Sequence, residues 1–336
     1  MDKKKIFLAV IIFFTLLGIY VYGQIHWPMN GVKNETVYFQ ISKGESVIKI
    51  AKDLADKKLV KSEVVFRLYA KYRHADEKFQ AGGYSLAKNL SMKQVIDELL
   101  LGANTGNEKS ITIIEGWQGV EIGDYLVSMG VTKKTDFIKA IEVSRWRSDY
   151  DFLADKRIKT LEGFMFPDTY RIYASSTIEA VVKKMLDNFE TKLTSDMISA
   201  ISKEKKKLYD VMILASIVEK EASSLSLVDK KIVAGIFWNR LSINMPLQSD
   251  ATVNYITGKS NLRPTYDELG ADSLYNTYKY AGLPPTPIAN PGLEAIEAAI
   301  YSVKTDYLYF LTDKDGRIHY GKTFEDHNKN IRQFLD

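Results

Sequence analysis

The feature that most constrains the fold of this chain is a short apolar run that ends in two glutamates. Residues 211–224 read VMILASIVEKEASS, and Glu219 and Glu221 follow directly after the apolar side chains. At 3.6 residues per turn, Leu214, Ile217 and Glu221 share one face of a helix. The pattern therefore predicts a buried helix with a carboxyl group at the end of its apolar stripe.

The two carboxyl groups are expected to differ in their surroundings. Glu221 continues the apolar stripe, so burial should raise its pKa toward the range in which an acid donates a proton near neutral pH. Glu219 lies about 200° further around the helix axis and is expected to be partly solvated or paired. We therefore choose Glu221 as the candidate catalytic acid. The alternative is structural, with Glu221 ending an amphipathic helix and pairing with Lys220, Lys230 or Arg240.

Composition indicates an ordinary globular protein and excludes several kinds of chemistry. Of the 336 residues, 46% are hydrophobic and 26% are charged, so the chain has room for two or three domains. Cysteine is absent, which excludes disulfides and thiol nucleophiles. The four histidines have no metal-ligand spacing, and no metal or organic cofactor is expected. The net charge of +4 is small for this length and gives no reason to expect nucleic acid as a partner.

The N-terminus carries a candidate membrane anchor. After MDKKK, residues 6–22 form a nearly uninterrupted apolar run, at the lower length limit for crossing a hydrocarbon core about 30 Å thick. No small-residue cleavage pattern follows, so we interpret residues 1–23 as a cytoplasmic tip and an uncleaved transmembrane anchor. The lysines before the run place the N-terminus in the cytoplasm and the rest of the chain outside. Residues 24–36 are expected to be a tether.

Residues 37–103 are expected to form a small α+β subdomain. Strand and helix patterns alternate there, with strands at 37–41 and 79–86 and helices at 47–54, 62–72 and 91–101. The opening YFQISKGESVIKIAKDL resembles the start of LysM-type glycan-binding modules. A domain that serves packing alone is the alternative.

Residues 108–336 are expected to form a larger mixed α+β domain. The segment 161–173, LEGFMFPDTYRIY, is rich in aromatic residues and either lines a sugar cleft or belongs to a core strand. The charged run 203–207, KEKKK, is predicted to be a solvated surface rather than a binding patch. Residues 307–320 are predicted to be a β-hairpin that turns at 313–316.

The segment 242–291 has little regular periodicity and is predicted to be a long loop. It holds five prolines between residues 264 and 291, whereas its many tyrosines argue against disorder. Ordered loops of this length are usually functional. Gln248, Asn276 and the tyrosine hydroxyls are candidate contacts to sugar hydroxyl and N-acetyl groups. A packing loop rich in tyrosine is the alternative.

Five separated motifs resemble the MltG (YceG-like) family of endolytic murein transglycosylases. In order, they are ILASIVEKEA, FWNRL, PLQSDATVNY, YNTYKYAGLPPTPIANPG and DYLYFLTDKDGRIHYGKTFEDHNKNI, and EGFMFPDTY upstream fits the same pattern. Several motifs in register are more specific than one short signature. The resemblance covers residue 111 to the C-terminus and implies a bacterial inner-membrane enzyme that cuts nascent peptidoglycan strands internally. The anchor and the LysM-like unit fit the family's architecture.

The resemblance also implies a mechanism and a set of site residues. In such enzymes the C6 hydroxyl of the cleaved sugar attacks its own C1 and leaves a 1,6-anhydro-N-acetylmuramic acid end, so one carboxyl suffices where hydrolases generally need two. The family's catalytic acid corresponds to Glu221, which a helix presents to the cleft as in lysozyme-like sites. Our candidates for fixing the sugars are Gln248, Tyr275, Asn276 and Tyr278. Asp250 is either a ligand contact or a loop cap, and Glu219 is either a supporting partner or a fallback catalyst.

We therefore predict an anchored α+β enzyme, on the periplasmic or extracytoplasmic side, that limits the elongation of glycan strands. Its expected partners are peptidoglycan strands, the membrane and the peptidoglycan synthases of the elongation machinery. The rival enzyme is a muramidase hydrolase that combines Glu221 with Asp250 or Glu219 as second carboxylate. A non-catalytic scaffold that binds the cell wall is the rival from another class.

Overall fold

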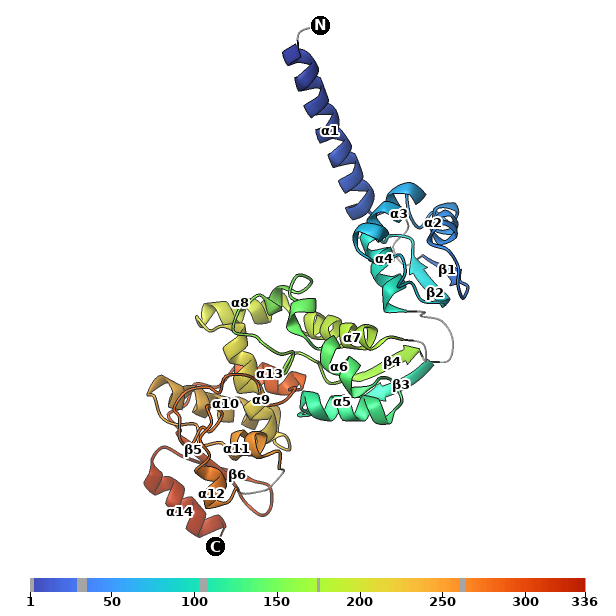
Figure 1. Cartoon of the computed structure of the whole chain (residues 1–336). Coiled ribbons are helices and arrows are strands. Elements are labelled where there is room, and N and C mark those ends of the chain that lie inside the picture. The colour runs from blue at the N-terminus through green and yellow to red at the C-terminus, as the bar shows by residue number, and fades with distance from the viewer. Residues whose placement is uncertain (1–2, 29–34, 103–107, 174–175, 260–263, 336) are drawn as a thin grey trace. The chain divides into compact units, whose positions relative to one another are not determined.

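The computed structural model describes residues 3–28, 35–102, 108–173, 176–259 and 264–335. The chain divides into two compact units, residues 1–111 with 171–181 and residues 112–170 with 182–336. Within the described residues, many helices accompany three two-stranded sheets (Figure 1). The predicted mixed α+β class is thus confirmed.

The first unit is built around an antiparallel strand pair in which Phe39 lies opposite Tyr84, and both of these rings are buried. Three of its helices begin after a serine whose side chain accepts a backbone N–H of the first turn, namely Ser46, Ser62 and Ser91, and Ser91 forms a complete capping box with Gln94. Its elements after α1 are β1 (Thr36–Ile41), α2 (Val47–Asp56), α3 (Glu63–Tyr72), β2 (Gly82–Ala87) and α4 (Met92–Leu101).

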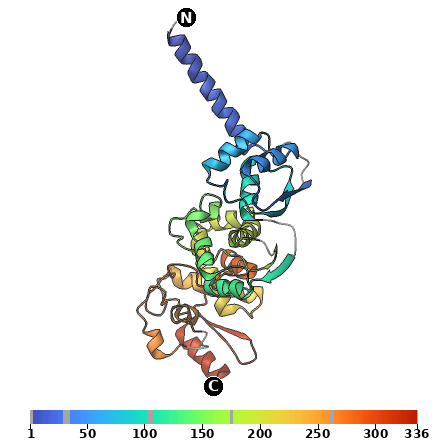
Figure 2. The same ribbon diagram turned by 45° about the vertical axis from the view of Figure 1, so that its right-hand side comes forward.

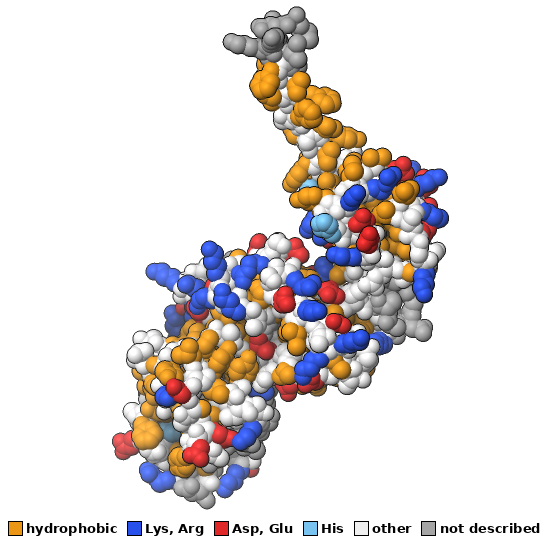
Figure 3. Space-filling view, viewed as in Figure 1, with side chains coloured by type: hydrophobic (Ala, Val, Ile, Leu, Met, Phe, Trp, Pro, Cys, Tyr) orange, Lys and Arg blue, Asp and Glu red, His pale blue; other side chains and the backbone are white. Residues whose placement is uncertain are grey.

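Helix α1 (Lys3–His26) belongs to the first unit and contacts α3 and α4. Along it, large apolar side chains are exposed, as the space-filling view shows (Figure 3); they include Phe7, Phe13 and Phe14. In the part of the chain that the structure describes, no helix combines the length and apolar character needed to cross a bilayer. The anchor over residues 1–23 therefore stays a prediction.

Most of the remaining elements belong to the second unit, whereas the larger part of β3 (Glu108–Thr112) and of β4 (Thr169–Tyr173) falls in the first. Strands β3 and β4 pair with each other, and the hairpin β5–β6 places Phe310 opposite Tyr320, which confirms the predicted hairpin. In order, the elements are β3 (Glu108–Thr112), α5 (Gly119–Ser128), α6 (Lys134–Ala140), the 3-10 helices η1 (Val143–Arg145) and η2 (Asp151–Leu153), β4 (Thr169–Tyr173), α7 (Ile178–Lys192), α8 (Ser195–Lys203), α9 (Leu208–Ala222), α10 (Leu227–Ser242), α11 (Asp250–Thr257), α12 (Tyr266–Leu269), α13 (Leu293–Ile300), β5 (Tyr309–Thr312), β6 (Ile318–Gly321) and α14 (Phe324–Phe334).

Helix α9 is the centre of the second unit. Every side chain from Val211 to Glu219 is buried, because apolar residues occupy all faces of this part of the helix. Helices α10, α11 and α13 all contact it (Figures 1 and 2). The predicted helix is confirmed, and it is covered on more sides than a single apolar stripe requires.

The prediction that residues 242–291 form a long loop is wrong, because α11 and α12 lie within this segment. Both helices are short, so they show little periodicity, but their ends carry local signals. A capping box between Thr265 and Glu268 starts α12, and Gly258, with φ 67°, ends α11 in the left-handed conformation that glycine favours.

Candidate active site

Glu221 lies in the last turn of α9 and reaches the start of α11. Its Oε1 accepts a hydrogen bond from Ser249 Oγ at 2.5 Å and one from the backbone N–H of Ala251 at 3.3 Å. Burial raises the pKa of the Glu221 carboxyl, and the two hydrogen bonds oppose this shift because they stabilise the charged form. The nearby charge of Asp250 raises the pKa further. The group is therefore suited to hold a proton and then to bear a charge.

The structural alternative for Glu221 required an ion pair, and its three candidate partners are engaged elsewhere. Among the described contacts, Lys230 pairs with Glu294, Arg240 donates to the carbonyl oxygens of Leu247 and Leu308, and Lys220 approaches the carbonyl oxygen of Gly116. The Glu221 carboxyl is thus held by neutral donors and not by a cation.

Glu221 also lines a cavity with a volume of about 450 Å³. This size lies in the range of about 300–1,000 Å³ that is usual for ligand pockets. The wall combines α10, the segment before α11, the β5 strand and α14, and its polar and aromatic side chains include Gln248, Asp250, Tyr278, Tyr309, Phe324 and His327.

Three of the predicted substrate contacts, Gln248, Asp250 and Tyr278, line this cavity. The Tyr278 hydroxyl donates to Asp250 Oδ1 at 2.5 Å. Burial, and then this hydrogen bond, raises the pKa of Tyr278. Gln248 is exposed and has φ 50°, a conformation that costs a residue with a side chain some strain and that clusters at functional sites. Its backbone N–H donates to Thr277 O at 3.0 Å, which holds it there.

The other two predicted contacts do not line this cavity. Asn276 is fully buried, and its amide donates to the carbonyl oxygens of Leu269 and Ala271, each at 2.9 Å. The Tyr275 hydroxyl is hydrogen-bonded to Thr286 Oγ1 at 2.9 Å. Both side chains therefore hold the segment together at the positions where the structure places them.

Glu219 was expected to be partly solvated or paired, and the expectation of solvation is wrong. The residue is only 3% exposed, because α13 covers that side of α9. Its Oε2 accepts the backbone N–H of Gly292, the N-cap of α13, at 2.9 Å. Burial raises the pKa of Glu219, and the charge of Glu115 acts in the same direction. Glu219 does not line the cavity of Glu221.

Sequence reasoning missed several residues of the site. Ser249 lies between two of the chosen residues, and its hydroxyl is the donor closest to Glu221. His327 comes from α14, where its ring stacks on Tyr309 with 5.3 Å between the centroids. Its Nδ1 is buried with no partner among the described residues, and burial lowers its pKa. No group of three side chains able to ligate a metal ion occurs within the described ranges.

Residues 39–333 match the model of the YceG-like family. The chain belongs to the YceG-like family. It is 35% identical to the endolytic murein transglycosylase of Bacillus subtilis (strain 168), over 95% of this chain and 90% of that protein. It is 31% identical to the protein of the same name from Streptococcus pneumoniae serotype 2 (strain D39), over 92% of this chain and 60% of that protein. A solved yceG-like protein from Listeria monocytogenes is 33% identical, with a TM-score of 0.60, and the match covers 88% of this chain and 99% of that one.

Membership in the YceG-like family confirms the resemblance that the five motifs indicated. The family match begins within β1 and extends into α14, so it includes elements of both compact units. The motifs alone reached only from residue 111 onward. The YceG-like character of this chain therefore extends to its first unit.

Proposed function

We propose that this chain is an endolytic murein transglycosylase. It cleaves the bond between N-acetylmuramic acid and N-acetylglucosamine within peptidoglycan strands and leaves 1,6-anhydro-N-acetylmuramic acid ends. Family membership and two curated relatives that carry this name support the proposal. The observation that carries it is the Glu221 carboxyl, which is desolvated, free of cationic partners among the described residues and part of the wall of a cavity of about 450 Å³.

In the proposed mechanism Glu221 acts twice. Its carboxylic acid first protonates the oxygen of the leaving sugar, and the resulting carboxylate then accepts the proton of the C6 hydroxyl that attacks C1. Burial favours the acid before the first step, and Ser249 Oγ and the Ala251 N–H stabilise the carboxylate after it. No second carboxylate is required, because the substrate supplies the nucleophile.

The neighbouring side chains are proposed to hold the sugars. The hydrogen-bonded pair of Tyr278 and Asp250 and the exposed amide of Gln248 can bind hydroxyl or N-acetyl groups. The rings of Tyr309 and Phe324 offer apolar faces to a pyranose in the same cavity. Tyr275 and Asn276 are proposed to act indirectly, because their hydrogen bonds keep the Tyr278 segment in place. Glu219 is proposed to act as a support that fixes α13 against α9.

A muramidase hydrolase is the second candidate, and one observation favours it. Asp250 lines the same cavity as Glu221 and raises its pKa electrostatically, so a second carboxylate is at hand. Against this role, Asp250 Oδ1 already accepts the hydrogen bond from Tyr278. The two reactions differ in their products, since hydrolysis leaves a reducing end.

Mass analysis of digested glycan strands tests the proposal. The full chain should shorten intact strands by internal cuts and yield ends lighter than reducing ends by one water. The variant Glu221→Gln, which keeps the size of the side chain, should lose activity by roughly 10³-fold because one group supplies both proton transfers. Predominant reducing ends would establish the hydrolase instead, and intact strands after prolonged digestion by the unaltered chain would establish the scaffold.

We further propose that the protein acts outside the cytoplasm, held by residues 1–23, and limits strand elongation beside peptidoglycan synthases. The lysines at positions 3–5 and the apolar run that follows them support this orientation. Membrane fractions washed at alkaline pH should retain the full chain, whereas a variant that lacks residues 1–23 should be released. Release of the full chain by the wash would contradict the anchor.

A further inference from the structure

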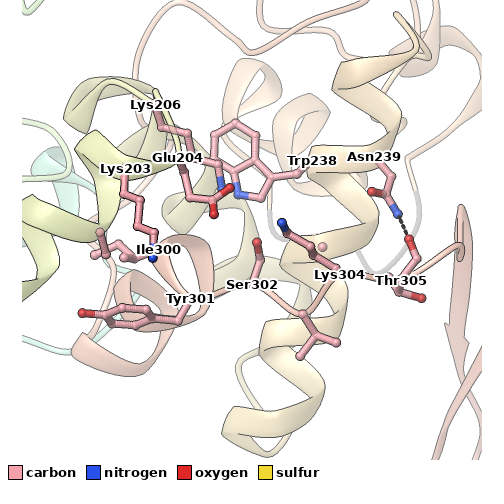
Figure 4. Close-up of a pocket in the computed structure, with 13 residues that line it drawn as sticks. Lys203, Glu204, Lys206, Trp238, Asn239, Ile300, Tyr301, Ser302, Lys304 and Thr305 are labelled. Carbon is pink, nitrogen blue, oxygen red and sulfur yellow. Dashed lines mark hydrogen bonds between the residues drawn. The ribbon is translucent and has the colours of Figure 1, made fainter.

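A second cavity, with a volume of about 640 Å³, lies in the second unit. The end of α8 with the residues that follow it, one face of α10, and the end of α13 with the segment after it line this cavity (Figure 4). Helix α10 separates it from the cavity of Glu221. Phe237 and Arg240 line the Glu221 cavity, whereas Gly235, Trp238 and Asn239 line the second one. At 100° per residue, the two sets point to opposite sides of the helix.

The wall of the second cavity is firmly built. A Cβ atom on Gly235 would lie 2.2 Å from the carbonyl oxygen of Val303, so glycine is what lets this segment approach α10 closely. Asn239 Nδ2 donates to Thr305 O at 2.6 Å, and the backbone N–H of Val303 donates to Lys231 O at 3.0 Å. The cavity is therefore held in shape by contacts within the protein.

The charges around the second cavity are unbalanced. Lys203, Lys206 and Lys304 line it together with a single carboxylate, Glu204. The ion pairs of the described chain join other lysines and leave these three ammonium groups without a carboxylate within 4.0 Å. Figure 3 shows blue side chains gathered over the region of α8. Of the KEKKK run, Lys206 alone is half-buried, and the other four residues are exposed as predicted.

Lys206 is the most buried of the three lysines that line the cavity. It is half-buried, and its Nζ lies over the Trp238 ring, 4.3 Å from the centroid. Burial lowers the pKa of Lys206; the charge of Glu204 raises it, and the repulsion from Lys304 lowers it by less than Glu204 raises it. The indole N–H of Trp238 is already used by Ala299 O at 2.9 Å, so the cationic donors of the lining are the three ammonium groups. An anion in the cavity would relieve the repulsion.

We propose that this cavity binds carboxylate groups of the peptide stems carried by the glycan substrate, an inference that rests on the proposed function. The lining mixes ammonium groups with the apolar surfaces of Ala200, Ile300 and Trp238, which suits an acidic peptide with small apolar side chains. Three lysines against one glutamate give the lining a small net positive charge, which suits one or two carboxylates better than a densely charged phosphate polymer.

The helix between the two cavities is comparable in size with a peptide stem. An α-helix with its side chains is about 10–12 Å thick, so the way around half of it is roughly 16–19 Å. A stem of about five residues extends to roughly 17 Å at 3.3–3.6 Å per residue. A fully extended stem is thus about as long as half the circumference of α10. Binding of its carboxylates would fix the register of the strand at the point of cleavage.

Binding to an uncleaved ligand tests the site independently of catalysis. In the full chain with Glu221→Gln, a disaccharide that carries an acidic tetrapeptide should bind at least ten-fold more tightly than the same disaccharide without peptide. Adding Lys206→Gln and Lys304→Gln should abolish this preference and leave the peptide-free ligand unaffected. Lys205→Gln is the matched control, because Lys205 belongs to the same charged run but does not line the cavity. Calorimetric titration measures binding, and thermal melting verifies that each variant is folded.

Cleavage measurements separate this inference from the proposed function. On strands with intact stems, the two lysine substitutions should raise KM about ten-fold with kcat unchanged; on strands stripped of stems they should change neither. If the unaltered chain cleaves but the lysine substitutions change nothing, the second site is refuted and the proposed function stands. If the chain never cleaves but binds stems in a lysine-dependent way, the proposed function is refuted and the second site stands. Tighter binding of a soluble phosphate polymer than of the peptide ligand would also overturn the inference.

Discussion

Glu219 and Glu221 lie on different faces of α9 near its C-terminal end, and their carboxyl groups have different surroundings. Glu219 accepts an N–H at the start of α13 and Glu221 accepts one at the start of α11, and burial raises the pKa of both. Glu219 is 3% exposed within packed protein, whereas Glu221 lines a cavity. A helix N-terminus and a raised pKa therefore do not by themselves distinguish a catalytic carboxyl from a structural one. The feature that distinguishes them is whether a ligand can reach the carboxyl group.

A third carboxyl group, that of Glu162, also combines a raised pKa with a helix N-terminus and does not line the cavity of Glu221. Glu162 accepts the backbone N–H of Gly119 at the start of α5 at 3.0 Å, and the Asn290 amide donates to it at 2.8 Å. Burial raises the pKa of Glu162 to about 7, the value expected of a general acid at neutral pH. The residue nevertheless does not line the cavity of Glu221. Its hydrogen bonds join residues 162–164 to the start of α5 and to Asn290.

The largest expected effect that separates the two faces of α9 is on activity. Glu221→Gln should lower kcat by roughly 10³-fold, and Glu219→Gln by less than ten-fold, because only Glu221 can reach a substrate. The rate of release of anhydro-ended fragments measures both. Thermal melting of the two variants controls for unfolding, since Gln at position 219 keeps an acceptor for the Gly292 N–H. Equal losses in two folded variants would remove the distinction between them.

The sequence was sufficient to predict what depends on local spacing. The α9 helix and the β5–β6 hairpin follow from periodicity and turn residues, whereas the choice of Glu221 as the acid stays a prediction. The surroundings of Glu219 depend on Gly292, which is 73 residues further along the chain, and the donor to Glu221 comes from a residue 28 positions away. Helical spacing contains no information about which later element covers a given face. For this reason the solvation of Glu219 was predicted wrongly and His327 was missed.

An intermediate effect is expected on the pH dependence of stability through Glu162. The pKa of an ordinary glutamate is 4.5 and that of Glu162 is about 7, so the folded chain binds an extra proton between these values and stability falls as pH rises from 4.5 to 7. Allowing for its partial exposure, the loss should be on the order of 2 kcal/mol. Glu162→Gln should flatten this part of the profile, measured by denaturant unfolding at each pH, whereas Glu190→Gln, at an exposed position of α7, should not. Parallel profiles for Glu162→Gln and the unaltered chain would contradict the assignment.

The smallest expected effect distinguishes Ser249, which donates to Glu221, from Ser216, which lies in the buried part of α9. The hydrogen bond from Ser249 lowers the pKa of Glu221, so Ser249→Ala should raise it and carry the alkaline limb of the kcat/KM profile to higher pH by roughly one unit. The rate at the optimum should fall several-fold, because a charge-assisted bond of about 1.5–3 kcal/mol no longer stabilises the carboxylate. Ser216 is the matched control, since its Oγ accepts the Ile288 N–H at 3.0 Å within the buried part of α9. Ser216→Ala should lower the melting temperature and leave the limb in place. A shifted limb in the Ser216 variant alone would mean that the titrating group lies on the packed side of α9, and Glu221 would then lose its role.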